Sequence, residues 1–174
     1  FMSSDWSSDV CSSDLGLPFY ADDENPDGIV GANDVVLLKI NGQWNARGGT
    51  NTDLIESVIL AVLAHPEGFT GEVIVADNGQ AQYGSRGRGG SMDWEKNNAA
   101  DTSQSVADVV DATREAGSVS AFLWDEITRH EVQEYSAGDY DDGYVLEEEK
   151  ASTGSRITYP KFQTEFGTYV SFKH

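Results

Sequence analysis

Polar residues that could bind a small molecule follow an apolar run near the start of the chain. Residues 34–41 read Asp-Val-Val-Leu-Leu-Lys-Ile-Asn, and a polar loop with glycines leads from there to Thr50. Branched apolar residues between turn formers are typical of a buried parallel strand. Open α/β sheets bind ligands beyond the carboxyl ends of such strands, where the free N–H groups of the next helix attract anions. The candidate ligand-binding residues are Lys39, Asn41, Arg47, Thr50, Asn51, Thr52, Asp53, Asp77 and Asn78.

The same residues also have a purely structural interpretation. The segment 50–53 can cap the helix that follows it, and Lys39 can extend its apolar stem along the edge of a strand. Asp77 and Asn78 can form the turn that ends a second strand. The sequence leaves both interpretations open and assigns no catalytic residue.

An acidic segment at 23–34 has the spacing of a calcium-binding loop. Such loops place oxygen ligands at positions 1, 3 and 5, a glycine at 6 and an acid at 12. The segment 23–34 follows this spacing and resembles the calcium repeat of dockerin modules. The candidate calcium ligands are Asp23, Asn25, Asp27 and Asp34. The segment departs from the pattern because position 12 is Asp, Pro26 interrupts the ligands, and neither a preceding helix nor a second repeat is present. The alternative is a plain acidic turn.

The sequence does not contain the residues that several common kinds of site require. The only cysteine is Cys11, so no iron–sulfur cluster and no zinc-thiolate site is expected in the chain that follows it. No Gly-x-Ser-x-Gly, His-Glu-x-x-His or Walker sequence occurs. The glycine run at 84–90 lacks the spacing of a dinucleotide-binding loop, so we interpret it as a flexible basic loop.

The elements that must position the candidate residues form a strand–helix–strand unit. Apolar residues recur at helical spacing over 54–64, after the strand at 34–41. Glu-Val-Ile-Val-Ala at 72–76 predicts a second buried strand. A strand, a helix and a strand with short connections form a right-handed βαβ unit and therefore a parallel sheet.

Further elements are predicted beyond the second strand. The polar stretch 80–102 is a candidate binding loop, 105–116 a helix capped by Ser105, and 118–124 a third strand. We expect an exposed acidic segment at 139–149 and an antiparallel hairpin at 156–173. The predicted fold class is α/β: a mostly parallel sheet with βαβ units in a three-layer, incomplete domain, plus a C-terminal β-hairpin.

The two ends of the chain predict its domain organisation. Residues 1–15 contain Ser-Ser-Asp three times, and Ser-Ser-Asp-Leu is the translation of the end of a common sequencing adapter. We therefore expect a non-native leader over 1–15 and a single α/β domain over 16–174. The chain stops at His174 without a closing helix, so we expect the N-terminal fragment of a longer protein whose C-terminal half is missing. A lost native N-terminus leaves the compartment unassigned.

The charge of the chain limits its partners. Thirty acidic and eleven basic residues give a net charge of -19, which repels the phosphates of nucleic acids and of anionic lipids. No run of residues approaches the roughly 18 apolar residues of a membrane helix. We therefore expect a small molecule or a metal cation as partner, and neither nucleic acid nor membrane.

Three stretches together resemble the amino-terminal part of the domain of unknown function 362 family. They are Val-Val-Leu-Leu-Lys-Ile-Asn at 35–41, Gly-Gly-Thr-Asn-Thr-Asp at 48–53, and the segment 65–80 with its Val-Ile-Val-Ala-Asp-Asn-Gly. The resemblance implies an α/β domain, joined in some members to iron–sulfur ferredoxin modules, with a distant similarity to nickel-dependent lactate racemases. The family's Leu-Pro-x-x-Lys-x-His stretch would lie beyond His174.

Two functions follow from these observations. The first hypothesis is a small-molecule or metal-handling enzyme whose cleft is built at the carboxyl ends of the first two strands. The second is a non-catalytic calcium-binding or surface module that uses the acidic loop 23–34. Burial of both Lys39 and Asn41 under a helix would contradict the first hypothesis, and an unchanged melting temperature with calcium would contradict the second.

Overall fold

The structure is a computed structural model that describes residues 16–43, 48–79, 90–93, 99–147, 154 and 156–173. Its first elements are two short strands, β1 (Tyr20–Ala21) and β2 (Val30–Gly31), which pair in parallel. They lie beside the C-terminal end of helix α2 (Thr52–Leu63), where the Tyr20 hydroxyl donates a hydrogen bond of 2.7 Å to the Ala61 carbonyl. The His65 ring also lies 3.1 Å from the Ala21 carbonyl oxygen. The segment before the main sheet is therefore fixed to the first helix.

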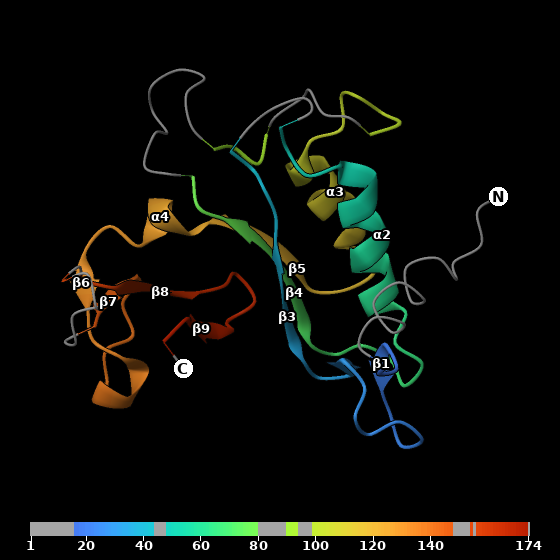
Figure 1. Cartoon of the computed structure of the whole chain (residues 1–174), viewed down its shortest axis with the longest axis horizontal. Coiled ribbons are helices and arrows are strands. Elements are labelled where there is room, and N and C mark those ends of the chain that lie inside the picture. The colour runs from blue at the N-terminus through green and yellow to red at the C-terminus, as the bar shows by residue number, and fades with distance from the viewer. Residues whose placement is uncertain are drawn as a thin grey trace.

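The main sheet has three parallel strands in the order of the chain. They are β3 (Val35–Lys39), β4 (Glu72–Asp77) and β5 (Val119–Leu123). In register, Lys39 lies opposite Ala76, and Asp77 lies opposite Leu123. A helix connects each strand to the next, so the predicted parallel βαβ units are confirmed (Figure 1).

Both connecting helices begin at the caps that hold their first turns. Helix α2 (Thr52–Leu63) follows Asn51, whose side chain accepts a hydrogen bond of 3.2 Å from the Leu54 N–H. Helix α3 (Val106–Thr113) follows Ser105, which forms a reciprocal capping box with Asp108. Such caps satisfy N–H groups that have no partner within the helix.

The core lies between these helices and one face of the sheet. Alternate strand residues point to this face, as the period of two in a strand requires. Val73, Val75 and Val119 are fully buried there. The helices contribute Ile55, Ile59, Val62, Val106, Val109 and Val110 to the same cluster. Figure 1 shows α2 and α3 on one side of the sheet and the C-terminal strands on the other.

The C-terminal part forms a four-stranded mixed sheet. Its strands are β6 (Glu131–Val132), β7 (Gly143–Leu146), β8 (Thr158–Gln163) and β9 (Tyr169–Ser171), in that order. β8 and β9 are antiparallel, which confirms the predicted hairpin, while β6 and β7 are parallel. Two short helices, α4 (Trp124–Ile127) and η1 (Tyr135–Ala137), lie before β7.

The prediction of a wholly exposed segment at 139–149 is wrong for the residues that form β7. Gly143 and Val145 are buried, because their strand pairs with β8 on one side and β6 on the other. A methyl group on Gly143 would lie within 3 Å of the His130 carbonyl oxygen and of a Val132 side-chain carbon. This strand was not predicted because its alternation of buried and half-buried residues spans only four positions, among many acidic residues.

A buried carboxylate joins the two sheets. The Glu72 side chain accepts a hydrogen bond of 2.6 Å from the Ser120 hydroxyl and one of 2.8 Å from the Thr164 hydroxyl. Glu72 is 2% exposed. The Phe122 and Phe162 rings also pack with their centroids 5.1 Å apart. The C-terminal sheet is therefore packed on β4 and β5, on the side that faces away from α2 and α3.

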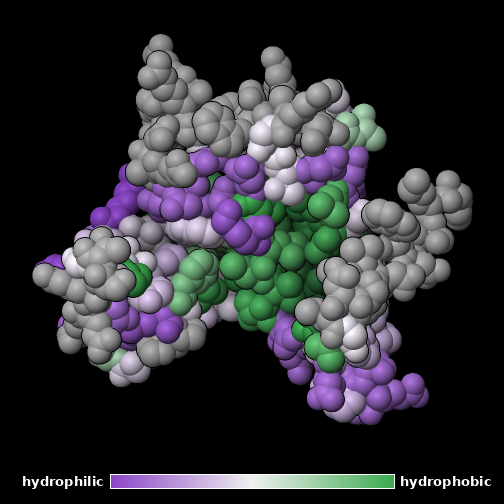
Figure 2. Space-filling model, in the orientation of Figure 1, coloured by the Kyte–Doolittle hydropathy of each residue, from purple (hydrophilic) through white to green (hydrophobic). Residues whose placement is uncertain are grey.

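β3 is an edge strand with apolar side chains on the surface. Val35 is 49% exposed and Leu37 is 38% exposed. The space-filling view shows apolar surface where β3 lies (Figure 2). Within the described residues, no helix is long and apolar enough to cross a membrane.

Candidate functional site

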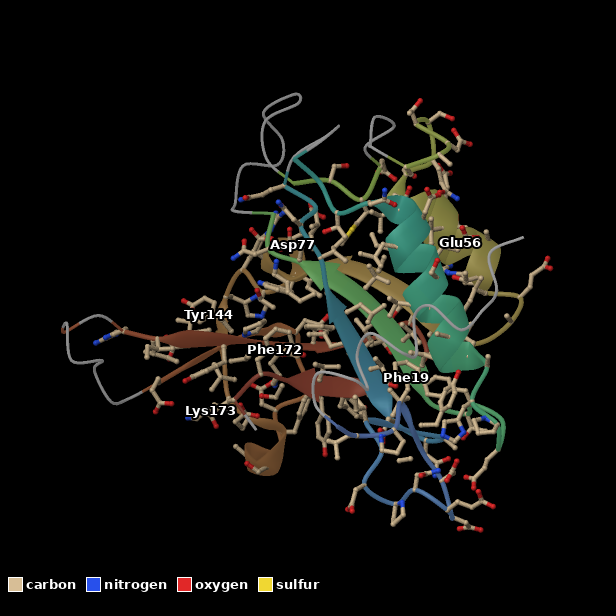
Figure 3. All side chains as sticks on the ribbon, turned by 45° about the vertical axis from the view of Figure 1, so that its right-hand side comes forward. Phe19, Glu56, Asp77, Tyr144, Phe172 and Lys173 are labelled. Atoms are coloured by element: carbon tan, nitrogen blue, oxygen red, sulfur yellow. The ribbon has the colours of Figure 1, made fainter. Side chains whose placement is uncertain are left out.

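The carboxyl ends of β3 and β4 are joined by an ion pair. The Lys39 ammonium lies 2.5 Å from Asp77 Oδ1 and also donates a hydrogen bond to the Ile40 carbonyl. The Asp77 side chain is 5% exposed, whereas that of Lys39 is 56% exposed. Figure 3 labels Asp77 at the end of the sheet near the first turn of α2. A buried carboxylate thus holds a solvent-facing ammonium at the edge of the sheet.

The other carboxylate oxygen of Asp77 fixes the backbone after β3. Gly42 donates its N–H to Asp77 Oδ2 over 2.7 Å in a buried hydrogen bond. The Gly42 carbonyl accepts a hydrogen bond of 2.9 Å from the Ser91 N–H. Gly90 donates to the Gly79 carbonyl over 3.2 Å. Asp77 therefore fixes the backbone after β3, and backbone hydrogen bonds join residues 90 and 91 to the segments that follow β3 and β4.

Asn41 and Thr50 close the loop between β3 and α2. The Asn41 N–H donates to the Thr50 hydroxyl oxygen over 2.8 Å, and the Thr50 N–H donates to the Asn41 carbonyl over 3.0 Å. The Asn41 amide also donates to the Gly48 carbonyl over 2.7 Å. Asn41 is exposed and Thr50 is half-buried. Their polar groups shape the loop, and Asn41 is not covered by a helix.

The three polar residues at the N-terminal end of α2 have different surroundings. The Asn51 side chain caps the helix, and Asp53 Oδ2 accepts a hydrogen bond of 2.7 Å from the Ala100 N–H. Thr52 is 2% exposed, and its hydroxyl lacks a hydrogen-bond partner in the described residues. The capping interpretation is therefore confirmed for Asn51, while Asp53 links the helix to the segment before α3.

Asp125 is a further acidic residue at this edge that sequence reasoning missed. Its carboxylate accepts a hydrogen bond of 2.7 Å from the Gly79 N–H, which directly follows Asn78. Asp125 lies in α4, just beyond the carboxyl end of β5. The rule that selected Asp77 would have found it, because Asp125 also follows a predicted parallel strand.

The structure therefore brings the predicted ligand residues together in two groups. Lys39 and Asp77 form the first group at the strand ends, with the exposed Asn78 following β4. Asn41, Thr50 and the first turn of α2 form the second group around the connecting loop. Arg47 lies outside the described residues, as do most positions of the predicted binding loop 80–102.

The predicted calcium residues lie in the turn around β1 and β2. Asp22, which was not predicted, accepts hydrogen bonds from the Asn25 N–H, the Asn25 amide and the Glu24 N–H. The Asn25 backbone N–H, as the strongest influence, and then its side-chain amide lower the pKa of Asp22. Asp34 accepts a hydrogen bond of 2.8 Å from the Gly31 N–H.

No group of three or more His, Cys, Asp or Glu side chains is placed to hold a metal ion in the part of the chain that the structure describes. Asp23 and Asp27 are exposed in the same turn. Calcium binding through Asp23, Asn25, Asp27 and Asp34 stays a prediction.

Comparison of the chain with protein-family models, with curated proteins and with solved structures finds no match.

Proposed function

We propose that the chain is a small-molecule-binding α/β protein whose site lies at the carboxyl ends of β3 and β4. The observation that carries the proposal is the Lys39–Asp77 ion pair, which presents an ammonium group at the edge of a parallel sheet. This is the position at which open α/β sheets bind ligands. Lys39 and Asn41 both reach the surface, so the condition that would contradict this hypothesis is not met.

Lys39 has one N–H donor more than its two contacts use. An ammonium group carries three donors. One contacts the Ile40 carbonyl and one contacts Asp77, while the side chain remains more than half exposed. The third donor and the charge favour a small anionic ligand with a carboxylate or phosphate group. The net charge of -19 repels an anion more strongly the more charge it carries, so the proposed ligand is a compact anion and not a polyanion.

The metal-handling form of the hypothesis has less support at this position. Both carboxylate oxygens of Asp77 already accept contacts, one from Lys39 and one from Gly42. An enzymatic role would use the Lys39 ammonium to stabilise negative charge on a bound substrate. We also propose that the chain resembles the domain of unknown function 362 family, and the strand end at 35–41 supports this. We further propose a three-layer architecture, which the covered faces of the main sheet support.

Ligand-dependent melting tests the proposal directly. The protein is melted with a panel of small carboxylates and phosphates, and a binding anion raises the melting temperature by mass action. We expect Lys39→Met to lose this increase and Lys173→Met, which changes a lysine of the C-terminal segment, to retain it.

The double variant Lys39→Met/Asp77→Asn controls for folding. It removes the cation and the buried anion together, so its fold does not contain an unpaired Asp77 charge. Retention of the full ligand-induced increase in this folded double variant would contradict the proposal.

A further inference from the structure

Three tyrosines form a cluster at one end of the C-terminal sheet. Tyr135 comes from η1, Tyr140 from the connection that follows, and Tyr169 from β9. The ring centroids of Tyr135 and Tyr169 lie 5.0 Å apart, and those of Tyr140 and Tyr169 lie 5.5 Å apart. The Tyr135 and Tyr140 centroids are separated by 6.0 Å. Each ring therefore contacts the other two.

Tyr135, the least exposed ring of the cluster, is held in place by Phe162 and Lys161 of β8. The Tyr135 hydroxyl donates a hydrogen bond of 2.9 Å to the Phe162 carbonyl. The ammonium of the fully buried Lys161 lies 4.5 Å from the centroid of the Tyr135 ring. The same ammonium donates to the Gln133 carbonyl over 2.7 Å and to the Asp139 carbonyl over 2.8 Å. The cluster thus has a rigid base, and one cation already contacts an aromatic face in it.

The outer tyrosines are open to solvent. Tyr140 is 61% exposed and Tyr169 is 51% exposed. Aromatic rings with one buried edge and an open surface are enriched where proteins bind partners, because they supply a large contact area with little loss of side-chain freedom. The exposed rings of Tyr140 and Tyr169 therefore form an aromatic surface without a covering element in the described residues.

Carboxylates around the cluster are held in fixed positions. Asp139 accepts hydrogen bonds from the Gln133 and Asp141 N–H groups, and Asp142 accepts one from the Gln163 N–H. Glu134 accepts a hydrogen bond from the Ser171 hydroxyl. Lys161 is fully buried beneath Tyr135, and its ammonium lies 3.5 Å from Asp139 Oδ1, so it compensates Asp139 and presents no positive charge to solvent. The surface around the exposed rings is therefore negative.

We propose that Tyr140 and Tyr169 form a docking surface for a basic polypeptide segment. An arginine side chain of the partner would lie flat on the exposed rings, and neighbouring carboxylates would contact its guanidinium. Arginine fits both features, because its planar cation stacks on aromatic rings and donates hydrogen bonds to carboxylates. This inference does not depend on the Lys39–Asp77 site, which lies in the main sheet.

Calorimetric titration with a short peptide of alternating glycine and arginine tests the proposal. The titration is carried out at near-physiological salt, where interactions between distant surface charges are screened. We expect Tyr140→Ala and Tyr169→Ala each to weaken binding by about two- to fivefold, since an exposed cation–aromatic contact is lost without any change in charge. The matched control Phe166→Ala changes an exposed aromatic residue at the turn between β8 and β9 and should leave the affinity unchanged.

Tyr140→Leu separates the aromatic contact from simple apolar contact. This variant keeps an apolar side chain but removes the ring face, so it should bind as weakly as Tyr140→Ala. Equal peptide affinity in the wild type and both alanine variants would overturn the proposal, because bulk charge alone would then explain binding. Binding of free arginine amide as tight as that of the peptide would overturn the assignment of a polypeptide partner.

Discussion

Lys39 and Asp77 join the carboxyl ends of two parallel strands that helix α2 separates in sequence. Their charged groups lie 2.5 Å apart, and the Asp77 carboxylate is almost fully buried while the Lys39 side chain is not. This asymmetry makes the two residues unequal: Asp77 depends on its partner for charge compensation, whereas Lys39 can be solvated by water. Substitution of Lys39 therefore leaves a buried Asp77 charge without compensation, whereas substitution of Asp77 leaves a lysine that water can solvate.

Lys39→Met is expected to lower the free energy of unfolding by about 1–2 kcal/mol, less than for a fully buried pair because Lys39 is exposed. Adding Asp77→Asn removes the uncompensated charge, so the double variant should lose less stability than the sum of the two single variants. Urea unfolding of the four proteins measures this coupling. Additive effects would show that the pair is not coupled.

The contact between the sheets gives a second prediction. Thr164→Val removes one of the two hydroxyl donors to the buried Glu72 carboxylate. We expect a loss of about 1–3 kcal/mol in stability, the range for a buried acceptor that loses its partner. The control Thr102→Val changes an exposed threonine and should alter stability by less than about 0.5 kcal/mol. Equal stabilities of the two variants in urea would contradict the role of this contact.

The capping box of α3 predicts a pH-dependent effect. The pKa of Asp108 is lowered mainly by the hydrogen bond from the Ser105 N–H and also by the one from the Ser105 hydroxyl. Because the folded pKa lies below the unfolded value, this contribution is present above about pH 4 and is lost as the pH falls through the folded pKa. Ser105→Ala should cost about 1 kcal/mol near neutral pH and less in acid. Urea titrations at both pH values, with Ser136→Ala as an exposed control, provide the measurement.

Tyr135 is expected to ionise at a higher pH in the folded protein than in the unfolded chain. Burial, as the main cause, and the nearby Asp142 carboxylate raise the pKa of Tyr135 to about 12. The raised value means that the folded state holds this proton more tightly than the unfolded chain, so stability decreases as the pH rises from about 10 through 12. Absorbance titration of phenolate should show a late phase that is missing in Tyr135→Phe. An unchanged late phase in this variant would assign it to another tyrosine.

Calcium should leave the melting temperature unchanged. Asp34 already accepts a hydrogen bond from Gly31, and the Asn25 amide contacts Asp22. Melting with added calcium and with a chelator tests this expectation, and Asp23→Asn/Asp27→Asn serves as the comparison protein. An increase in melting temperature that the double variant lacks would instead support the calcium-binding module.

Local patterns predicted the main sheet well because its strands and helices carry strong periodicity. Val73 to Ala76 are uniformly apolar, and Ser105 with Asp108 has the spacing of a capping box, so each element could be recognised from neighbouring residues. The partners of Glu72 could not be recognised in this way. Thr164 lies ninety-two positions away, and nothing in either local sequence indicates that a strand-initial glutamate is buried.

The candidate site was predicted in part for the same reason. Strand ends are local features, so Lys39 and Asp77 were both selected, and they meet in the structure. Their pairing depends on which strands are neighbours. Asp125 was missed although it directly follows the predicted strand 118–124, because the strand-end rule was applied only to the first two strands.

The Glu72–Thr164 contact also has a consequence for how the chain folds during synthesis. β3, β4 and β5 leave the ribosome before β8 and β9, and domains fold from the segments that are already available. Until Thr164 arrives, the Glu72 carboxylate has its Ser120 partner but lacks the second hydroxyl. We therefore expect the main sheet to form first, and the C-terminal hairpin to dock on it as a late step that completes the partners of Glu72.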